Sequence, residues 1–179
     1  GHVGTALAPV LHYVGFRVVV YDNRPDFAKP DHSPSAEQVI LGDYLKKDLA
    51  EGTITLDEAR EYIAHFWIKG CEWIGAGDVF EGSGDGQHYQ NIILSGVDVD
   101  GNDVENEVTF LVLDVVEETL ISDFPIAVRL SKRSSEKLFR RVAEVQRLGT
   151  GTVAIYNNDF IIKTLVDFGH DIREARDFA

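Results

Sequence analysis

The sequence predicts an α/β fold built around a parallel sheet, and three observations support this. The chain has 179 residues, of which 44% are hydrophobic, enough for the core of one domain. Short apolar runs alternate with longer helical patterns, at 89–94, 105–120, 125–130, 135–148, 153–156 and 158–168. The short runs have the length and composition of buried strands, whereas the longer patterns repeat every three or four residues. Such alternation is typical of a parallel α/β layer or barrel.

Residues 1–44 predict a separate β-α unit. A helical apolar pattern extends from Gly1 to Gly15, where the glycine favours termination. Phe16–Tyr21 is a valine-rich run of the kind found in buried parallel strands. Val39–Leu41 is a second, shorter strand candidate. The pattern changes after Tyr44, so we expect one unit over 1–44 and another over 45–179.

The first helix of the second unit is expected from Thr55 to about Lys69. Thr55 and Glu58 have the spacing of a capping box. In this motif the threonine hydroxyl accepts the amide hydrogen of the glutamate, and the glutamate side chain reaches back to the threonine amide. The glycine-rich stretch 75–86 then predicts a loop before the strand at 89–94.

The later elements are predicted from caps, turns and apolar faces. Residues 98–102 predict a turn, and the helix over 105–120 presents one apolar face, formed by Val108, Leu111, Val112, Val115 and Val116. Ser134 is the expected cap of a helix that ends at Gly149. A second capping signature, at Asp171–Glu174, opens a last helix.

Composition disfavours several classes of partner. The formal charge of −13 repels phosphate backbones and anionic lipid, which argues against nucleic acid. No apolar stretch is long enough to span a membrane, and no secretory signal is visible. The single cysteine, Cys71, excludes an internal disulfide and a cysteine-rich zinc site, and fits a reducing, cytoplasmic location. The histidines are scattered, so no metal site is expected.

A partial dinucleotide-binding pattern lies at the start of the chain. Gly1 and Gly4 precede a helix, and Asp22 ends the strand about 20 residues later. In that arrangement the glycines approach a pyrophosphate and the aspartate meets a ribose hydroxyl, so an NAD-like nucleotide is the ligand to consider. The first glycine and the strand before it are missing. A β-α-β segment that binds no ligand is therefore the alternative.

These N-terminal residues resemble the C-terminal Rossmann domain of XdhC/CoxI-type proteins. The resemblance rests on residues 1–9, 15–28 and 39–43, including Asp22-Asn23-Arg24-Pro25. It implies a truncated Rossmann fragment over 1–44. It also implies an alternative function, a nucleotide- or molybdenum-cofactor-binding accessory protein for xanthine dehydrogenase.

Residues 45–179 resemble the pyruvate formate-lyase domain of glycyl radical enzymes. The matching stretches follow in the family's order: 48–59, 66–69, 89–98, 100–103, 106–114, 128–130, 150–151 and 154–158. The resemblance implies a partial α/β barrel of the pyruvate formate-lyase type. The Gln90-Asn91 and Tyr156-Asn157 pairs look closer to the diol dehydratase and choline lyase branch than to formate C-acetyltransferase.

The resemblance also implies the chemistry. In this family a glycyl radical, installed by a radical SAM activating enzyme, generates a cysteine thiyl radical that abstracts hydrogen from a small-molecule substrate. Carbon–carbon, carbon–oxygen or carbon–nitrogen cleavage follows. The family's catalytic cysteine and radical glycine have no counterpart in these residues, and Cys71 stands in a different context. We therefore expect no catalytic residue, no bound cofactor and no activity in a fragment that begins at Gly1 and stops within a helix. A chance join near residue 44 with no function as a unit is a third hypothesis.

Five residues are candidates for a substrate pocket because they lie on or near the expected barrel strands: Tyr89, Gln90, Asn91, Arg129 and Tyr156. Each has a plainer alternative. The two amides could satisfy backbone groups, Arg129 could pair with a carboxylate, and Tyr156 could belong to the core. Asp98, Asp100 and Asp103 resemble the start of a calcium loop but lack its later glutamate, so a turn is preferred.

Overall fold

The computed structural model describes residues 42–71, 91–121 and 125–178. Within these ranges one parallel sheet is accompanied by helices. The strands are β1 (Ile92–Ser95), β2 (Ile126–Leu130) and β3 (Val153–Asn157). The helices are α2 (Gly42–Glu51), α3 (Leu56–Cys71), α4 (Glu107–Thr119), α5 (Glu136–Gln146), α6 (Asn158–Asp167) and α7 (Ile172–Phe178). This confirms an α/β fold with a parallel sheet.

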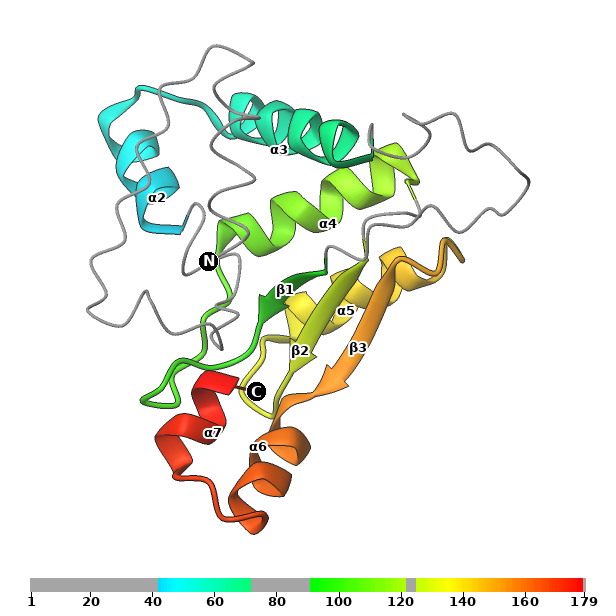
Figure 1. The fold of residues 1–179 in the computed structure, drawn as a ribbon. Coiled ribbons are helices and arrows are strands. Elements are labelled where there is room, and N and C mark those ends of the chain that lie inside the picture. The colour runs from blue at the N-terminus through cyan, green and yellow to red at the C-terminus, as the bar shows by residue number, and fades with distance from the viewer. Residues whose placement is uncertain (1–41, 72–90, 122–124, 179) are drawn as a thin grey trace, which may run out of the picture.

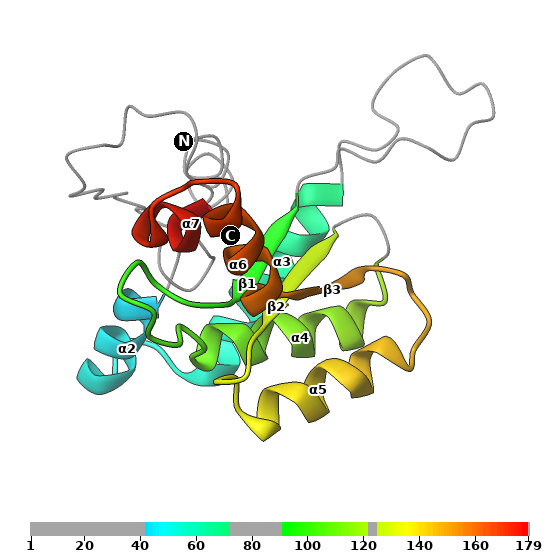
Figure 2. The same cartoon turned by 90° about the horizontal axis from the view of Figure 1, so that it is seen from below.

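The sheet has the strand order β1-β2-β3, with both neighbouring pairs parallel. Helix α4 connects β1 to β2, and α5 connects β2 to β3. Both connecting helices pack on the same face of the sheet, and α3 covers the outer side of α4 (Figure 1). Helices α6 and α7 lie beyond the carboxyl ends of the strands (Figures 1 and 2). The opposite face of the sheet therefore carries no helix from these crossovers.

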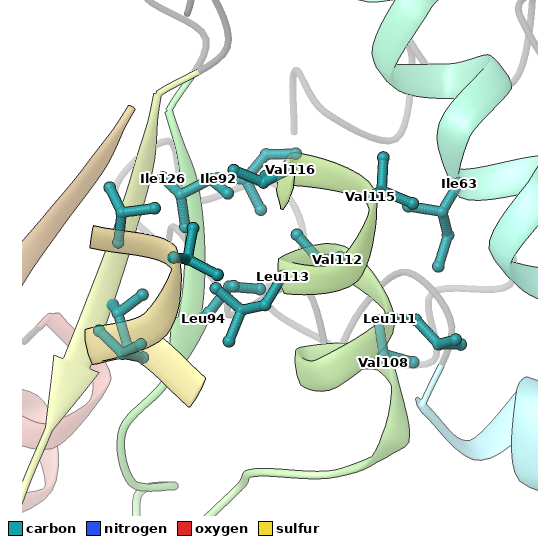
Figure 3. Close-up of a cluster of buried hydrophobic side chains, with 14 of the residues drawn as sticks. Ile63, Ile92, Leu94, Val108, Leu111, Val112, Leu113, Val115, Val116 and Ile126 are labelled. Atoms are coloured by element: carbon teal, nitrogen blue, oxygen red, sulfur yellow. The ribbon is translucent and has the colours of Figure 1, made fainter. Parts of the chain in front are cut away.

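Helix α4 forms the centre of the core because it is packed on two sides (Figure 3). The predicted face is confirmed, since its five side chains are all buried: Val108, Leu111, Val112, Val115 and Val116. Leu113 is also 0% exposed, on the side that points to Leu94 and Ile92 of β1. Ile63 of α3 meets Val115 from the other side. Each fully buried aliphatic side chain of this kind contributes roughly 1.5 to 3 kcal/mol.

The predicted capping box of α3 is confirmed. The Thr55 amide donates to Glu58 Oε2 at 2.8 Å, and the Glu58 amide donates to Thr55 Oγ1 at 3.2 Å. Helix α4 has a reciprocal cap of the same design, between Asn106 and Thr109. The predicted cap at Ser134 is wrong by one residue. Ser135 is the N-cap of α5, because its hydroxyl accepts the Leu138 amide at 3.0 Å, while the Ser134 hydroxyl accepts the Ser131 amide.

Two further findings concern the start of elements. Helix α2, which begins at Gly42, was not expected; the division of the chain after residue 44 stays a prediction. The described part of the strand β1 begins at Ile92, and the predicted start at residue 89 lies outside the described residues. None of the helices in the described ranges is long and apolar enough to cross a bilayer.

Candidate functional site

The sheet register aligns three polar side chains in one row at the carboxyl ends of the strands. Ser95 is the partner of Arg129 across β1 and β2, and Arg129 is the partner of Tyr156 across β2 and β3. Side chains alternate between the two faces of a strand. Because Leu94 and Val128 point into the core beneath α4, this row lies on the opposite face. The row is the candidate site.

Arg129 is the buried centre of the row. It is only 6% exposed, and its Nε donates to Asn158 Oδ1 at 2.8 Å. Asn158 is the first residue of α6 and is itself 0% exposed. A buried cation requires hydrogen-bonding partners, because desolvation is costly. A carboxylate partner was the plainer alternative for Arg129 and stays a prediction; the hydrogen bond that joins β2 to α6 ends on the amide oxygen of Asn158.

The chain leaves β1 through an unusual turn beside Arg129. Ser95 has a φ of 56°, which is rare for a residue other than glycine, and Gly96 follows with a φ of 106°. The Ser95 hydroxyl donates to the backbone oxygen of Arg129 at 2.6 Å. A Cβ placed on Gly96 would lie 3.1 Å from Cζ and Nε of Arg129. The guanidinium group therefore packs directly against the Gly96 backbone.

Tyr156 forms the open end of the row. It is 44% exposed, so it does not belong to the core, which was the plainer alternative for this residue. The next residue, Asn157, accepts the Phe160 amide at 3.0 Å and so caps α6. The cap fixes the direction of the chain as it passes from β3 into α6.

The structure brings together two of the five predicted pocket residues, Arg129 and Tyr156. Asn91 is exposed and precedes β1, so it lies at the amino end of the strand, whereas the row lies at the carboxyl end. Four residues of strand separate the two ends by about 13 Å. Tyr89 and Gln90 lie outside the described residues, as do Gly1, Gly4 and Asp22. The nucleotide hypothesis for residues 1–44 thus stays a prediction.

Three residues of the site were not predicted: Ser95, Gly96 and Asn158. The available signals were a glycine directly after a strand and a repeated asparagine at the start of a helix. Neither signal identifies a partner, because the contacts join positions about 30 residues apart in sequence.

The turn after β1 is a second cluster of polar contacts. Asp98 Oδ1 accepts the amides of Asp100 and Asn102 at 2.9 and 2.8 Å, which confirms the predicted turn. Partial burial opposes ionisation of Asp98, but the hydrogen bonds from Asn102, Asp100 and Gly101 outweigh it and lower its pKa. Within the described ranges, no group of three or more histidine, cysteine, aspartate or glutamate side chains is arranged to hold a metal ion.

Helix α7 is attached to this turn by arginines. Arg173 pairs with Asp100, and Arg176 donates to the backbone oxygen of Val99 at 3.2 Å. Arg133, which follows β2, donates to the backbone oxygen of Gly101. A Cβ on Gly101 would lie 2.9 Å from Cζ of Arg176. The turn thus connects the segments that follow β1 and β2 to α7.

Comparison with known proteins identifies the family. The family model described as pyruvate formate lyase-like matches residues 31–179. The chain belongs to this family. The match begins before residue 45 and therefore also covers 31–44, where the sequence resembled an XdhC-type fragment. That resemblance finds no counterpart among these matches.

The related proteins are dehydratases and lyases. The chain is 30% identical over 139 residues to trans-4-hydroxy-L-proline dehydratase of Clostridioides difficile, covering 76% of this chain and 18% of that protein. It is 30% identical over 142 residues to isethionate sulfite-lyase of Bilophila wadsworthia, covering 76% of this chain and 17% of that protein. The chain thus spans less than a fifth of the length of these relatives.

Solved structures share the fold. The structure describing 1,2-propanediol dehydration in Roseburia inulinivorans superposes with a TM-score of 0.64 at 33% identity, over 74% of this chain and 17% of that one. A glycyl radical enzyme from Archaeoglobus fulgidus gives a TM-score of 0.64 at 30% identity, over 75% and 18%. The predicted membership in the glycyl radical enzymes is confirmed.

Proposed function

We propose that this chain forms part of the barrel wall of a glycyl radical dehydratase or lyase that acts on a small molecule. The proposal rests on one observation above all. The row Ser95–Arg129–Tyr156 lies at the carboxyl ends of parallel strands, on the face away from α4 and α5. In α/β barrels the carboxyl ends of the strands hold the active site. Tyr156, the exposed member of the row, is the side chain proposed to face the substrate.

The proposed reaction is an elimination from a hydroxylated substrate. Relatives at 30% identity are a dehydratase of hydroxyproline and a sulfite-lyase of isethionate. A structure at 33% identity describes dehydration of 1,2-propanediol. These names share the loss of water or sulfite from a small molecule. They favour the dehydratase and lyase branch over acetyl transfer.

The radical groups are assigned to residues outside these 179. Cys71, the single cysteine, is the last residue of α3, whereas the candidate row lies at the carboxyl ends of the strands. The proposal therefore includes a thiyl cysteine and a radical glycine from elsewhere, a radical SAM activase as partner, and a cytoplasmic location. By itself the 179-residue chain is expected to form no radical.

A segment exchange tests the function. Residues 91–178 replace the aligned segment of the hydroxyproline dehydratase, and the exchanged enzyme is activated anaerobically by that enzyme's own activase. Electron paramagnetic resonance measures the glycyl radical, and product analysis follows trans-4-hydroxyproline, 1,2-propanediol and isethionate. We expect a radical doublet together with turnover of at least one of these three substrates.

The matched control is the same exchange with the segment of the Roseburia inulinivorans protein. If that control turns over 1,2-propanediol while the exchange with this chain forms the radical and converts none of the three substrates, the proposed function is wrong. A doublet on the 179-residue chain alone, after treatment with the activase, would contradict the assignment of the radical groups to other residues.

A further inference from the structure

Arg129, near the end of β2, contacts two segments that are distant from it in sequence. Its backbone oxygen accepts from the Ser95 hydroxyl, and its guanidinium group packs on Gly96. Its Nε donates to Asn158, 29 residues later. The end of β1, the end of β2 and the beginning of α6 therefore meet on one side chain.

The residues that surround the Arg129 side chain leave little room for it to move. Gly96 combines a φ of 106° with the close approach of the guanidinium group, so a larger residue there would strain the backbone and displace the Arg129 side chain. Asn158 is 0% exposed, and its Nδ2 has no hydrogen-bond partner among the described residues. The bond from Arg129 Nε to Oδ1 is thus the polar contact that the Asn158 side chain makes within the described residues. A second link, from the Lys132 amide to Asp159 Oδ2 at 3.0 Å, joins the same two segments.

We propose that Arg129 is a positioning residue, which holds the carboxyl ends of β1 and β2 against the first turn of α6 and thereby sets the position of Tyr156. In this role it acts on the site through its packing on Gly96 and its hydrogen bond to Asn158. This role matters for catalysis only if Tyr156, two residues before Asn158, faces the substrate as proposed above. The sequence had grouped Arg129 and Tyr156 together as pocket residues; the geometry separates their roles.

Asparagine, aspartate and leucine have similar volume and shape, so position 158 provides matched variants. Asn158→Asp keeps an oxygen that accepts from Arg129 Nε. Asn158→Leu removes it and leaves the volume. Arg129→Met removes the donor from the other side. A role in packing alone predicts that the two Asn158 variants behave alike, whereas a positioning role predicts that only Asn158→Asp retains the native arrangement.

The readout is amide hydrogen exchange on the full chain, without substrate or radical. Two amides report on the site: Phe160, which donates to the cap Asn157, and Val104, which donates to Gly96 O. Val112, inside α4, is the reference. Asn158→Leu and Arg129→Met should reduce protection at Phe160 and Val104 about tenfold more than at Val112, as expected for loss of a hydrogen bond to a charged group.

Asn158→Asp should keep protection at both amides within about threefold of wild type, less than a single neutral hydrogen bond is worth. The ring signals of Tyr156, assigned with Tyr156→Phe, should shift in Asn158→Leu and stay in place in Asn158→Asp. Equal loss at all three amides, or an Asn158→Leu variant indistinguishable from wild type, would overturn the proposal. The exchange measurement requires neither substrate nor radical. It therefore tests the positioning role of Arg129 even if the proposed reaction is wrong.

Discussion

Arg129 and Tyr156 are direct partners across β2 and β3, yet Arg129 is 6% exposed and Tyr156 is 44% exposed. The two side chains share a face of the sheet, so strand alternation does not explain the difference. The position of the strands does. Arg129 lies on the central strand, beneath Gly96 and Asn158, whereas Tyr156 lies on β3, which ends the described sheet. One end of the row is thus closed and the other is accessible.

This difference predicts unequal effects on stability. Arg129→Met should lower the free energy of unfolding by about 1 to 3 kcal/mol, because the buried oxygen of Asn158 loses its donor. Tyr156→Phe removes an exposed hydroxyl and should change it by less than about 0.5 kcal/mol. Urea unfolding of both variants measures the two values. Equal effects would show that burial does not distinguish the two positions.

The turn after β1 predicts a glycine-specific effect at Gly101. Gly101→Ala places a Cβ 2.9 Å from Cζ of Arg176, in a backbone with a φ of 84°. Gly52→Ala is the matched control, because Gly52 has a φ of 68° and nothing within 4 Å of the added Cβ. Both variants pay about 1 to 2 kcal/mol for the left-handed backbone. Gly101→Ala should in addition displace Arg176 and loosen α7.

Hydrogen exchange at the Ala175 amide, which donates to Asp171 O in the first turn of α7, checks this. Protection there should fall in Gly101→Ala and remain in Gly52→Ala after correction for global stability. An unchanged Ala175 amide in both variants would mean that Arg176 moves aside without releasing the helix.

Two aspartates of the same turn should respond to pH with opposite sign. Hydrogen bonds from Asn102, Asp100 and Gly101 outweigh burial and lower the pKa of Asp98. Its stabilising contribution is therefore present above the unfolded pKa of about 3.9 and is lost as the pH falls through the folded value. Burial raises the pKa of Asp103, reinforced by Glu105 and opposed by the Glu105 amide and by Arg133. The contribution of Asp103 is therefore full below the unfolded pKa and is lost as the pH rises through the folded value.

Substitution by asparagine distinguishes the contributions of Asp98 and Asp103 to stability. Asp98→Asn should be more destabilising at about pH 7 than at about pH 3, and Asp103→Asn should be more favourable, relative to wild type, at about pH 7 than at about pH 3. Urea unfolding of the wild type and both variants across this range measures the difference. Parallel pH profiles for the two variants would show that the turn does not perturb the carboxyl groups as described.

The sequence predicted correctly those features of the fold that depend on residues close together in the chain. The Thr55–Glu58 capping box and the buried face of α4 follow from spacing within one turn or one helix, and the structure confirms both. The error at Ser134 is also local: two serines stand side by side, and the competing bond from the Ser131 amide decides between them. Propensity alone does not resolve such competition.

The contacts of the candidate site could not be predicted in this way. Ser95, Arg129 and Asn158 are separated by about 30 residues each, and only the strand register places them together. Arg129 and Tyr156 were selected from strand position and family resemblance, which identify a location but not the degree of burial. Asn91 was selected on the same grounds and lies at the other end of β1. Burial and strand direction are tertiary properties, so they separate these roles only in the folded chain.

The charge network between α4 and α5 predicts a further contrast within one helix. Arg141 donates to Asp114 Oδ1 at 2.7 Å and also pairs with Glu117 and Glu144, and its side chain is 16% exposed. Burial alone would lower the pKa of Arg141, but the hydrogen bonds that Arg141 donates to Glu117 and Asp114, together with the charges of these carboxylates, outweigh it and raise the pKa. The neighbouring Arg140 makes one helical pair with Glu136 at 2.6 Å, and its side chain is 75% exposed.

Arg141→Met should therefore lower the free energy of unfolding by about 1 to 3 kcal/mol, because three carboxylates of an acidic protein lose their shared cation. Arg140→Met removes the same charge from the same helix and should cost less than about 1 kcal/mol, since an exposed pair gains little over solvation. Urea unfolding at low and at high salt measures both. Salt should weaken the Arg140 effect more than the Arg141 effect, because screening acts mainly on exposed charges. If both variants lose equal stability with equal salt dependence, the loss comes from removing one positive charge. The contacts of Arg141 between α5 and α4 then add no stability of their own.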